Sequence, residues 1–376
     1  MPIADSDLDS KSPDRPLSPS RSIWRQRFSR AVPWIKRLVF LAVLIGLVAA
    51  AKQSVARWQI ETNRLRTQAN QLLRSAAEAS DEPRRTELLS EADELERQIP
   101  SLTNLNWSHL VCSMLFYAGG LLPPCWILHR AVNASGLPCS MGRATAAQLL
   151  GHAGKYIPGK AMVVVLRVDA IARDRNESIR VGSSVFFETL LMMGVGGLLA
   201  GILLARSELP LWVRSVAVLM AVGSAIPVCP PLMRKLVSLL QKKGGDVPPT
   251  THGLTWSLLA SSAAASLVSW LLIGVSFAFL IAAIPSIESA PDLFSLFPVA
   301  TSAIALGMVL GFASLLPGGA GVREYVTLLV LTPVIGPTHG LLAVIAARLM
   351  FILVESALAG LAWLSLRRQA PLDSQL

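Results

Sequence analysis

The chain has 376 residues, of which 52% are hydrophobic and 15% are charged, and its mean hydropathy is +0.52. A typical soluble domain carries about 25% charged residues and does not need repeated apolar runs of membrane-spanning length. The composition therefore excludes an ordinary soluble domain and predicts an all-α, polytopic membrane protein.

The charged and metal-binding residue types exclude other classes of function. The chain has 34 Lys and Arg against 24 Asp and Glu, a net charge of +10. These basic residues are dispersed among short loops, which favours anionic lipid headgroups as partners over nucleic acid. The four cysteines and five histidines show no metal-ligand spacing. We therefore expect no nucleic-acid partner, metal, cofactor or disulfide.

The chain begins with a polar segment and a basic-flanked apolar run. Residues 1–32 are rich in Ser, Pro, Asp and Arg, a composition that cannot bury a core and predicts disorder. Residues 33–51 include LVFLAVLIGLVAAA, which follows several Lys and Arg residues. The positive-inside rule predicts a first transmembrane helix here, with the tail of residues 1–32 in the cytoplasm.

Residues 52–106 are predicted to form a helical hairpin outside the membrane. Apolar residues recur at heptad-like spacing in both halves, and Pro83 follows Ser80 and Asp81 in a helix-start arrangement. Acidic and basic residues nearly balance, as expected of a solvated helix pair on the extracytoplasmic side. The hairpin is either a spacer or a binding surface for a partner.

Hydropathy predicts five further spanning helices, over residues 108–129, 183–205, 211–230, 254–283 and 340–366. Together with the first helix they make about six, and residues 107–366 form a transmembrane domain. Most Lys and Arg lie in the loops that this order assigns to the cytoplasm. Both termini, including a tail of residues 367–376, are therefore predicted to be cytoplasmic.

Two apolar segments, residues 144–167 and 297–336, are interrupted by Pro-Gly turns. The turn residues are Pro158, Gly159, Pro317, Gly318 and Gly319. The arm before Pro158 has 14 residues, about 21 Å as a helix, which is short of a hydrocarbon core of roughly 30 Å. Each segment therefore predicts a re-entrant helical hairpin, whose irregular backbone must be buried in protein or line a wet cavity.

The two broken segments also resemble each other. GHAGKYIPGK and GFASLLPGGAG share a Gly-x-Ala start, a Pro-Gly pair and a downstream Arg. By the predicted topology they enter from opposite faces, which favours an inverted repeat like those of many secondary transporters. A chance match over so short a stretch is the alternative.

Ionisable residues fall within these apolar stretches. The cations, which are the candidate lipid-headgroup-binding residues, are Arg323, Arg348, Arg167, Lys160 and Lys155; the intramembrane carboxylates are Glu188, Glu324 and Glu355. A charge at the bilayer centre costs about 2.5–3.5 kcal/mol, so these groups should face the protein interior. Two interpretations stay open. The charges bind a ligand, or they form ion pairs that lock helices together, with Lys155 and Arg167 extending to the interface.

Cations beside the ends of half-helices suit an anionic ligand. Helix N-termini present unpaired N–H groups and a positive dipole end, and the planar guanidinium of Arg matches phosphate. Within a lipid-accessible cavity, a phosphate-bearing headgroup is the natural ligand of such a site.

Four stretches resemble a known family: LPGGAGVREYVTLLVL, GKYIPGKAMVVVLR, VFFETLLMM and AARLMFILVE. They are similar to motifs in the transmembrane region of lysylphosphatidylglycerol synthases and related flippase-like integral membrane proteins. The likeness covers roughly residues 108–366. It implies several helices with re-entrant elements, a bacterial cytoplasmic membrane, and lipid translocation or partnership with lipid-linked glycan synthesis.

The chain departs from the family pattern in two places. Thr189 stands where the motif has an Arg after the Glu, which leaves the ion pair of Glu188 open, and residues 52–106 are not part of the common core. The chain ends ten residues after Leu366. We therefore expect a stand-alone member without the soluble aminoacyl-transferase domain of the bifunctional synthases.

Three functions are compatible with these observations. The first is a flippase or transporter for an anionic or isoprenoid-linked lipid. The second is a non-catalytic accessory protein that partners a lipid-modifying or glycosyl-transferring enzyme. The third is an intramembrane enzyme with Glu188 or Glu324 as base, but the sequence shows no nucleophile-base constellation or phosphate-cradling loop. We therefore expect a non-enzyme.

Overall fold

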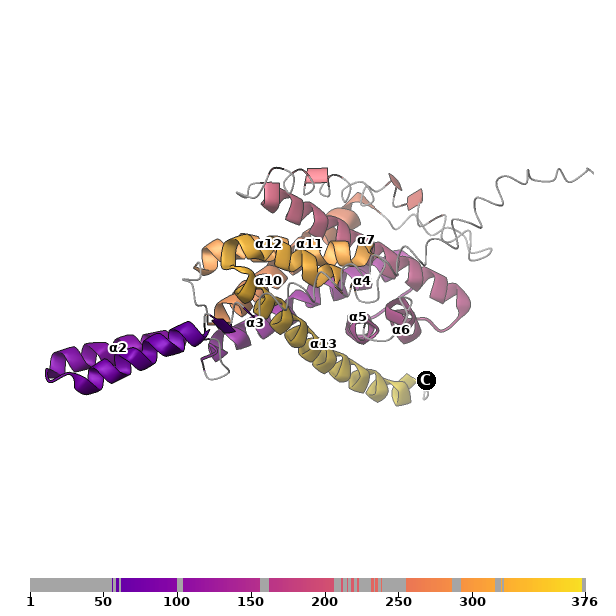
Figure 1. Ribbon diagram of the computed structural model, residues 1–376. Coiled ribbons are helices and arrows are strands. Elements are labelled where there is room, and N and C mark those ends of the chain that lie inside the picture. The colour runs from indigo at the N-terminus through magenta and orange to yellow at the C-terminus, as the bar shows by residue number, and fades with distance from the viewer. Residues whose placement is uncertain are drawn as a thin grey trace, which may run out of the picture. The chain divides into compact units, whose positions relative to one another are not determined.

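The computed structural model describes residues 62–99, 104–155, 162–205, 255–285, 292–314 and 321–373, with Gly319 and isolated positions at 56–60 and 211–238. All regular structure within these residues is helical, as predicted (Figure 1). The predictions for residues 1–32, 33–51 and most of 211–230 fall outside them. The predicted tail after residue 366 is described as far as Asp373, where it continues the last helix.

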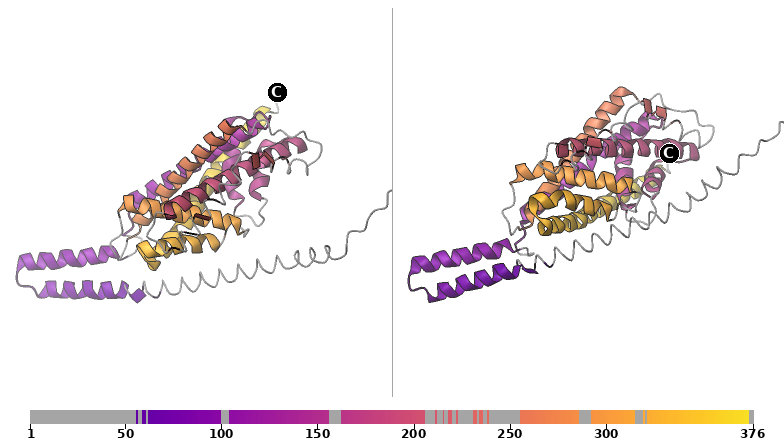
Figure 2. Two further views of the ribbon diagram at one scale, coloured as in Figure 1. Left: turned by 90° about the horizontal axis from the view of Figure 1, so that it is seen from above. Right: turned by 45° about the horizontal axis from the view of Figure 1, so that its top comes forward.

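The predicted hairpin is present as two helices, over residues 62–78 and α2 (Glu82–Gln98). They run antiparallel and side by side (Figures 1 and 2). Pro83 lies in the first turn of α2, where backbone N–H groups make no intrahelical hydrogen bond, so a residue without an N–H is tolerated. Small and apolar residues at the predicted heptad-like spacing are buried, among them Ala69, Ala76 and Ala92. The helix pair is confirmed, and its extracytoplasmic location stays a prediction.

Five helical segments of the described chain are long and apolar enough to cross a membrane: Trp107–Ala134, Arg175–Ala205, Trp256–Ala283, Leu293–Ala313 and Pro337–Arg367. Four of them match predicted spans. The first comprises α3 (Trp107–Gly120) and α4 (Leu122–Ala134); the others lie in α7 (Arg175–Ala205), α10 (Trp256–Ala283), α11 (Leu293–Ala313) and α13 (Pro337–Asp373). Side-chain caps start several helices, as where Thr255 Oγ1 accepts from the N–H of Leu258 at 3.1 Å.

The prediction for the second broken segment was wrong in one arm. Its first arm, α11, has 21 residues, or about 32 Å, which is enough to cross a hydrocarbon core. Its second arm, α12 (Val322–Ile335), has only 14 residues. The first broken segment has two short arms, α5 (Met141–Ala153) with 13 residues and α6 (Met162–Ile171) with 10. The two segments thus differ in length, and the inverted repeat stays a prediction.

Helix ends meet at one side of the described bundle. The backbone N–H of Asn106, before α3, donates to the carbonyl of Ala283 at the end of α10 (2.9 Å). The ring Nε2 of His339, at the start of α13, lies 3.0 Å from the carbonyl oxygen of Ile281 in α10. The starts of α3 and α13 therefore lie at the same level as the end of α10, which agrees with the predicted relative order of the spans.

The interior is one large apolar cluster that is crossed by buried polar contacts. Trp270 and Phe277 of α10 and Phe351 of α13 are almost fully buried in it. The indole N–H of Trp270 donates to the carbonyl of Met192 in α7 (2.9 Å). Helix α13 packs on α5 and α12, while α11 packs on α7, α10 and α12. These packings bring the ionisable residues of α5, α12 and α13 into the same interior.

Candidate functional site

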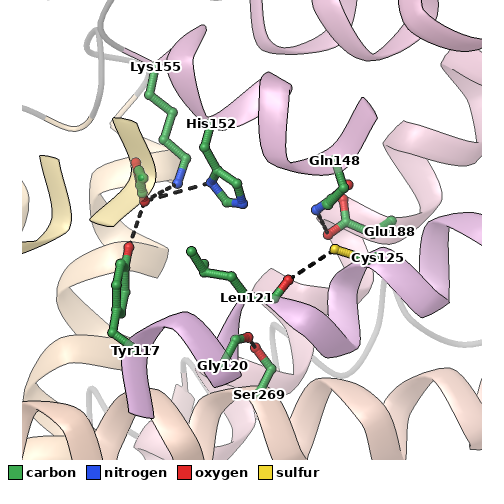
Figure 3. A network of polar contacts seen from close by, with 10 residues as sticks. Tyr117, Gly120, Leu121, Cys125, Gln148, His152, Lys155, Glu188 and Ser269 are labelled. Carbon is green, nitrogen blue, oxygen red and sulfur yellow. Dashed lines mark hydrogen bonds and ion pairs between the residues drawn. The ribbon is translucent and has the colours of Figure 1, made fainter. Parts of the chain in front are cut away.

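The first buried charge cluster centres on Glu355 of α13, whose side chain is 3% exposed. Its Oε1 lies 2.8 Å from Nζ of Lys155, which follows α5, and accepts a hydrogen bond from the Tyr117 hydroxyl of α3 at 2.6 Å. Tyr117, Lys155 and His152, all labelled in Figure 3, thus converge on this carboxylate. The cluster therefore ties three helices together around one negative charge.

The second cluster joins Arg167 of α6 to Glu188 of α7. Nη1 of Arg167 lies 2.8 Å from Oε2 of Glu188, and Gln148 of α5 donates to Oε1 at 3.1 Å. The hydroxyl of Thr189 donates to Oε2 at 3.2 Å. Arg167 is 4% exposed, so it does not extend to the interface. The ion pair left open by the sequence thus forms with Arg167.

The third cluster places two arginines on one carboxylate. Oε1 of Glu324 lies 3.5 Å from Nη2 of Arg323 and 3.3 Å from Nη1 of Arg348. Its Oε2 accepts the backbone N–H of Gly321 at 2.7 Å. Glu324 therefore caps the start of α12, an end that the sequence interpretation had assigned to the ligand. The two guanidinium groups keep further N–H groups for a ligand, since each can donate five hydrogen bonds.

A small cavity adjoins the third cluster. Its volume is about 10 Å³, and Arg323, Arg348, Thr327 and Phe351 are among the residues that line it. Such a volume holds about one water molecule. A phosphate group has four oxygens, each about the size of a water molecule, so the cavity in this conformation is too small to admit one.

Phe351 connects the first cluster to the third. The ring of Tyr117 stacks on it with centroids 4.1 Å apart, and the guanidinium of Arg323 lies 5.8 Å from its centroid. Arg348 and Glu355, predicted to share a helix face, reach different partners on either side of Phe351. The first and third clusters are therefore linked through the stacked rings of Tyr117 and Phe351.

The close approach of backbones explains how short helices position these side chains. Gly319 has φ +66°, and a Cβ there would lie 2.9 Å from Cα of Gly311 in α11. At the other broken segment, a Cβ on Gly154 would lie 2.8 Å from the backbone nitrogen of Val163 in α6. A side chain at either position would force two helices apart, which is why glycine occurs there.

Sequence reasoning missed three members of these clusters, Tyr117, Gln148 and His152. Gln148, His152 and Lys155 are spaced i, i+4 and i+7, so Gln148 and His152 share one face of α5 and Lys155 follows in the turn after it. That spacing was a signal in the sequence. Tyr117 had no such signal, since its role depends on α13 lying beside α3.

Several predicted site residues lie outside the described part of the chain: Lys160, Pro158, Gly159, Pro317 and Gly318. The described residues hold no group of three His, Cys, Asp or Glu that could bind a metal ion. Cys112, Cys125 and Cys139 are free thiols.

The helices and the three charge clusters, of which that of Arg167 and Glu188 is buried and that of Glu324 is half-buried, define a multi-span, α-helical membrane protein with ion pairs between its helices. Comparison with known proteins adds no family to this class: no protein-family model matches the chain, and no curated protein matches it.

Proposed function

We propose that this protein moves an anionic or isoprenoid-linked lipid across a bacterial cytoplasmic membrane, as the resemblance to flippase-like proteins implies. Membrane lipids are then its partners, and both termini face the cytoplasm. The protein itself makes or breaks no covalent bond. The observation that carries the proposal is the pair of arginines, Arg323 and Arg348, that share the single carboxylate of Glu324 beside a cavity.

The charge balance supports an anionic ligand. The three clusters contain four cations and three carboxylates: Lys155, Arg167, Arg323 and Arg348 against Glu188, Glu324 and Glu355. The surplus positive charge lies in the third cluster. An uncompensated cation at membrane depth costs several kcal/mol, and an anionic headgroup would remove much of that cost.

The small size of the cavity adds a conformational step. For a phosphate to reach Arg323 and Arg348, α12 and α13 must separate near the contact of Glu324 with Arg348, which joins them. Exchanging this contact for a bidentate contact with phosphate keeps each charge compensated during opening. The described conformation is then the closed state of the transport cycle.

Reconstitution in liposomes tests the proposal. Dithionite quenching would follow labelled phosphatidylglycerol, labelled isoprenyl phosphate and labelled phosphatidylcholine. We expect at least one of the two anionic probes to cross faster than in protein-free liposomes and faster than phosphatidylcholine. Arg348→Gln should slow this movement at least tenfold. Arg130→Gln, which removes an exposed arginine outside the clusters, should not.

Two results would contradict the proposal. Neither anionic probe would move faster than in protein-free liposomes, or Arg348→Gln and Arg130→Gln would slow the movement equally. Mass spectrometry of the same lipids should show unchanged covalent structure. A modified lipid would instead identify the protein as an enzyme.

The second candidate function is an accessory role beside a lipid-modifying or glycosyl-transferring enzyme. The helical hairpin favours it, because large apolar side chains such as Leu73 and Leu89 are exposed on it. In this case the charge clusters serve only to hold helices together. Changing Leu73 and Leu89 to Ser would then abolish the enzyme's activity in cells, and the purified protein alone would move no lipid.

A further inference from the structure

His152 occupies an unusual place between two of the buried clusters. Figure 3 shows its ring between Lys155 on one side and Gln148 with Glu188 on the other. Its Nδ1 lies 3.7 Å from Oε1 of Glu355, beyond hydrogen-bond distance, and the residue is 6% exposed. An imidazole with no fixed tautomer and a carboxylate nearby is a group that can take up a proton.

Four buried polar atoms, in this ring and in two neighbouring side chains, have no hydrogen-bond partner among the described residues. They are both ring nitrogens of His152, Oε1 of Gln148 and Nε of Arg167. Buried polar atoms are paired in the large majority of cases, and clusters of exceptions mark functional groups or internal water. Gln148 and Arg167 contact Glu188 and His152 lies near Glu355, so these unpaired atoms fit a place for internal water and a proton beside both carboxylates.

The charges that face His152 come from each helix packed around it. Burial opposes a proton on the ring most and lowers its pKa; Lys155, after α5, and Arg167 on α6 lower the pKa further, whereas Glu355 on α13 raises it. Tyr117 on α3 holds the same carboxylate oxygen as Lys155. The ring of Phe351, which stacks on Tyr117, also lies against the guanidinium of Arg323, so the charges of the first and third clusters are close enough to interact. The proton affinity of His152 therefore depends on the positive charge of these clusters.

We propose that His152 is a proton-binding site and that its occupancy is coupled to anion binding at Arg323 and Arg348. This inference rests on the proposed function for the identity of the anion. With His152 neutral, the clusters carry one surplus positive charge. A bound anion cancels that surplus and lowers the repulsion that a proton on His152 meets. Proton and anion then each strengthen the binding of the other, as linkage requires, and a proton gradient can drive the lipid.

Solid-state ¹⁵N NMR of histidine-labelled protein in nanodiscs tests proton binding directly. The ring-nitrogen shifts of neutral and charged imidazole are distinct, and the chain has only five histidines. We expect the His152 signal to titrate in the lower part of the range from pH 5 to pH 8, because burial lowers the pKa of its ring. Its midpoint should lie about one pH unit higher in phosphatidylglycerol nanodiscs than in phosphatidylcholine nanodiscs, a tenfold gain in proton affinity. His129, outside the clusters, reports the change that surface potential alone produces.

The signal is assigned by its loss in His152→Gln or, if that variant does not fold, by single substitutions of the other four histidines. A His152 ring that keeps one protonation state from pH 5 to pH 8 overturns the proposal. If the titration midpoints of His129 and His152 change equally between the two kinds of nanodisc, the coupling is overturned.

A transport measurement separates this inference from the proposed function. A pH gradient should speed movement of the anionic probe by the wild-type protein. The same gradient should not change the rate of movement by His152→Gln. Movement that ignores the gradient in wild-type protein overturns coupling and leaves the lipid transporter standing. Titration of His152 without any lipid movement overturns the transporter and leaves the proton site standing.

Discussion

At the scale of single residues, the three carboxylates of the clusters have similar surroundings, although Glu324 is only half-buried. Each lies against at least one cation and accepts at least one further hydrogen bond, as from Gln148 to Glu188 and from Tyr117 to Glu355. This is how proteins keep a buried charge ionised at tolerable cost. It also makes the loss of one partner more damaging than the loss of both.

The pair of Arg167 and Glu188 gives the first prediction. Glu188→Gln leaves the guanidinium of Arg167 buried without its carboxylate and should destabilise the protein by about 3–5 kcal/mol. Replacing both, as Arg167→Met with Glu188→Leu, should restore part of that loss. Thermal unfolding in nanodiscs measures both, and Glu91→Gln on the exposed face of α2 is the control. Equal melting of the wild type and Glu188→Gln would show that the pair contributes no stability.

A second prediction concerns Arg323 and separates ligand binding from a structural role. Arg323→Lys keeps the charge but loses the planar fork, so lipid movement should fall at least tenfold. Lipid movement by Arg323→Leu should fall as far. This variant should still fold, because Glu324 keeps its contacts with Arg348 and with the N–H of Gly321. Lipid movement and melting temperature are recorded for both variants. Normal movement by the Lys variant, with a strongly destabilised Leu variant, would assign Arg323 to structure alone.

At the scale of elements, the contact between α11 and α12 determines where the arginines lie. The two helices run antiparallel and touch closely: Thr327 of α12 donates to the carbonyl of Arg323 and lies 3.4 Å from the carbonyl oxygen of Ala303 in α11. The chain reverses between them through Gly319 and Gly321, which both have positive φ. A short helix thus gains its place from a full-length neighbour.

The third prediction tests this close approach. Gly319→Ala adds a Cβ that meets the backbone of Gly311, and the left-handed conformation itself costs a non-glycine residue about 1–2 kcal/mol. We expect a clear fall in melting temperature and slower lipid movement. Gly142→Ala is the matched control, since its Cβ would meet nothing within 4 Å and alanine favours the helix. Equal melting of the two variants would remove the packing argument.

At the scale of the whole molecule, the hydrogen bonds of Asn106 and His339 to the end of α10 fix which helix ends share a side. These hydrogen bonds do not show which side of the membrane is the cytoplasmic one. The assignment of the cytoplasmic side rests on the distribution of Lys and Arg among the loops, which orients helices as they insert into the membrane.

The fourth prediction is that the hairpin turn and the C-terminus lie on opposite faces. Single cysteines at Ser80→Cys and Ser374→Cys are introduced after replacement of the four native cysteines. A membrane-impermeant thiol reagent should label position 80 in intact cells and position 374 only after permeabilisation. The reverse pattern would invert the topology, and labelling of both positions in intact cells would reject the predicted odd number of crossings between them.

The sequence by itself determined the membrane class, four of the five described spans, the helical hairpin and the residues that carry buried charge. These follow from local properties, since the hydropathy of about twenty consecutive residues decides whether a segment enters the bilayer. Only the tertiary structure decided that Lys155 pairs with Glu355, that Arg167 pairs with Glu188, and that two arginines share Glu324. It also showed α11 to be a full-length helix and placed His152 between two clusters. Pairings of this kind join residues from different helices, so they depend on which helices pack together, and no pattern along the chain records that choice.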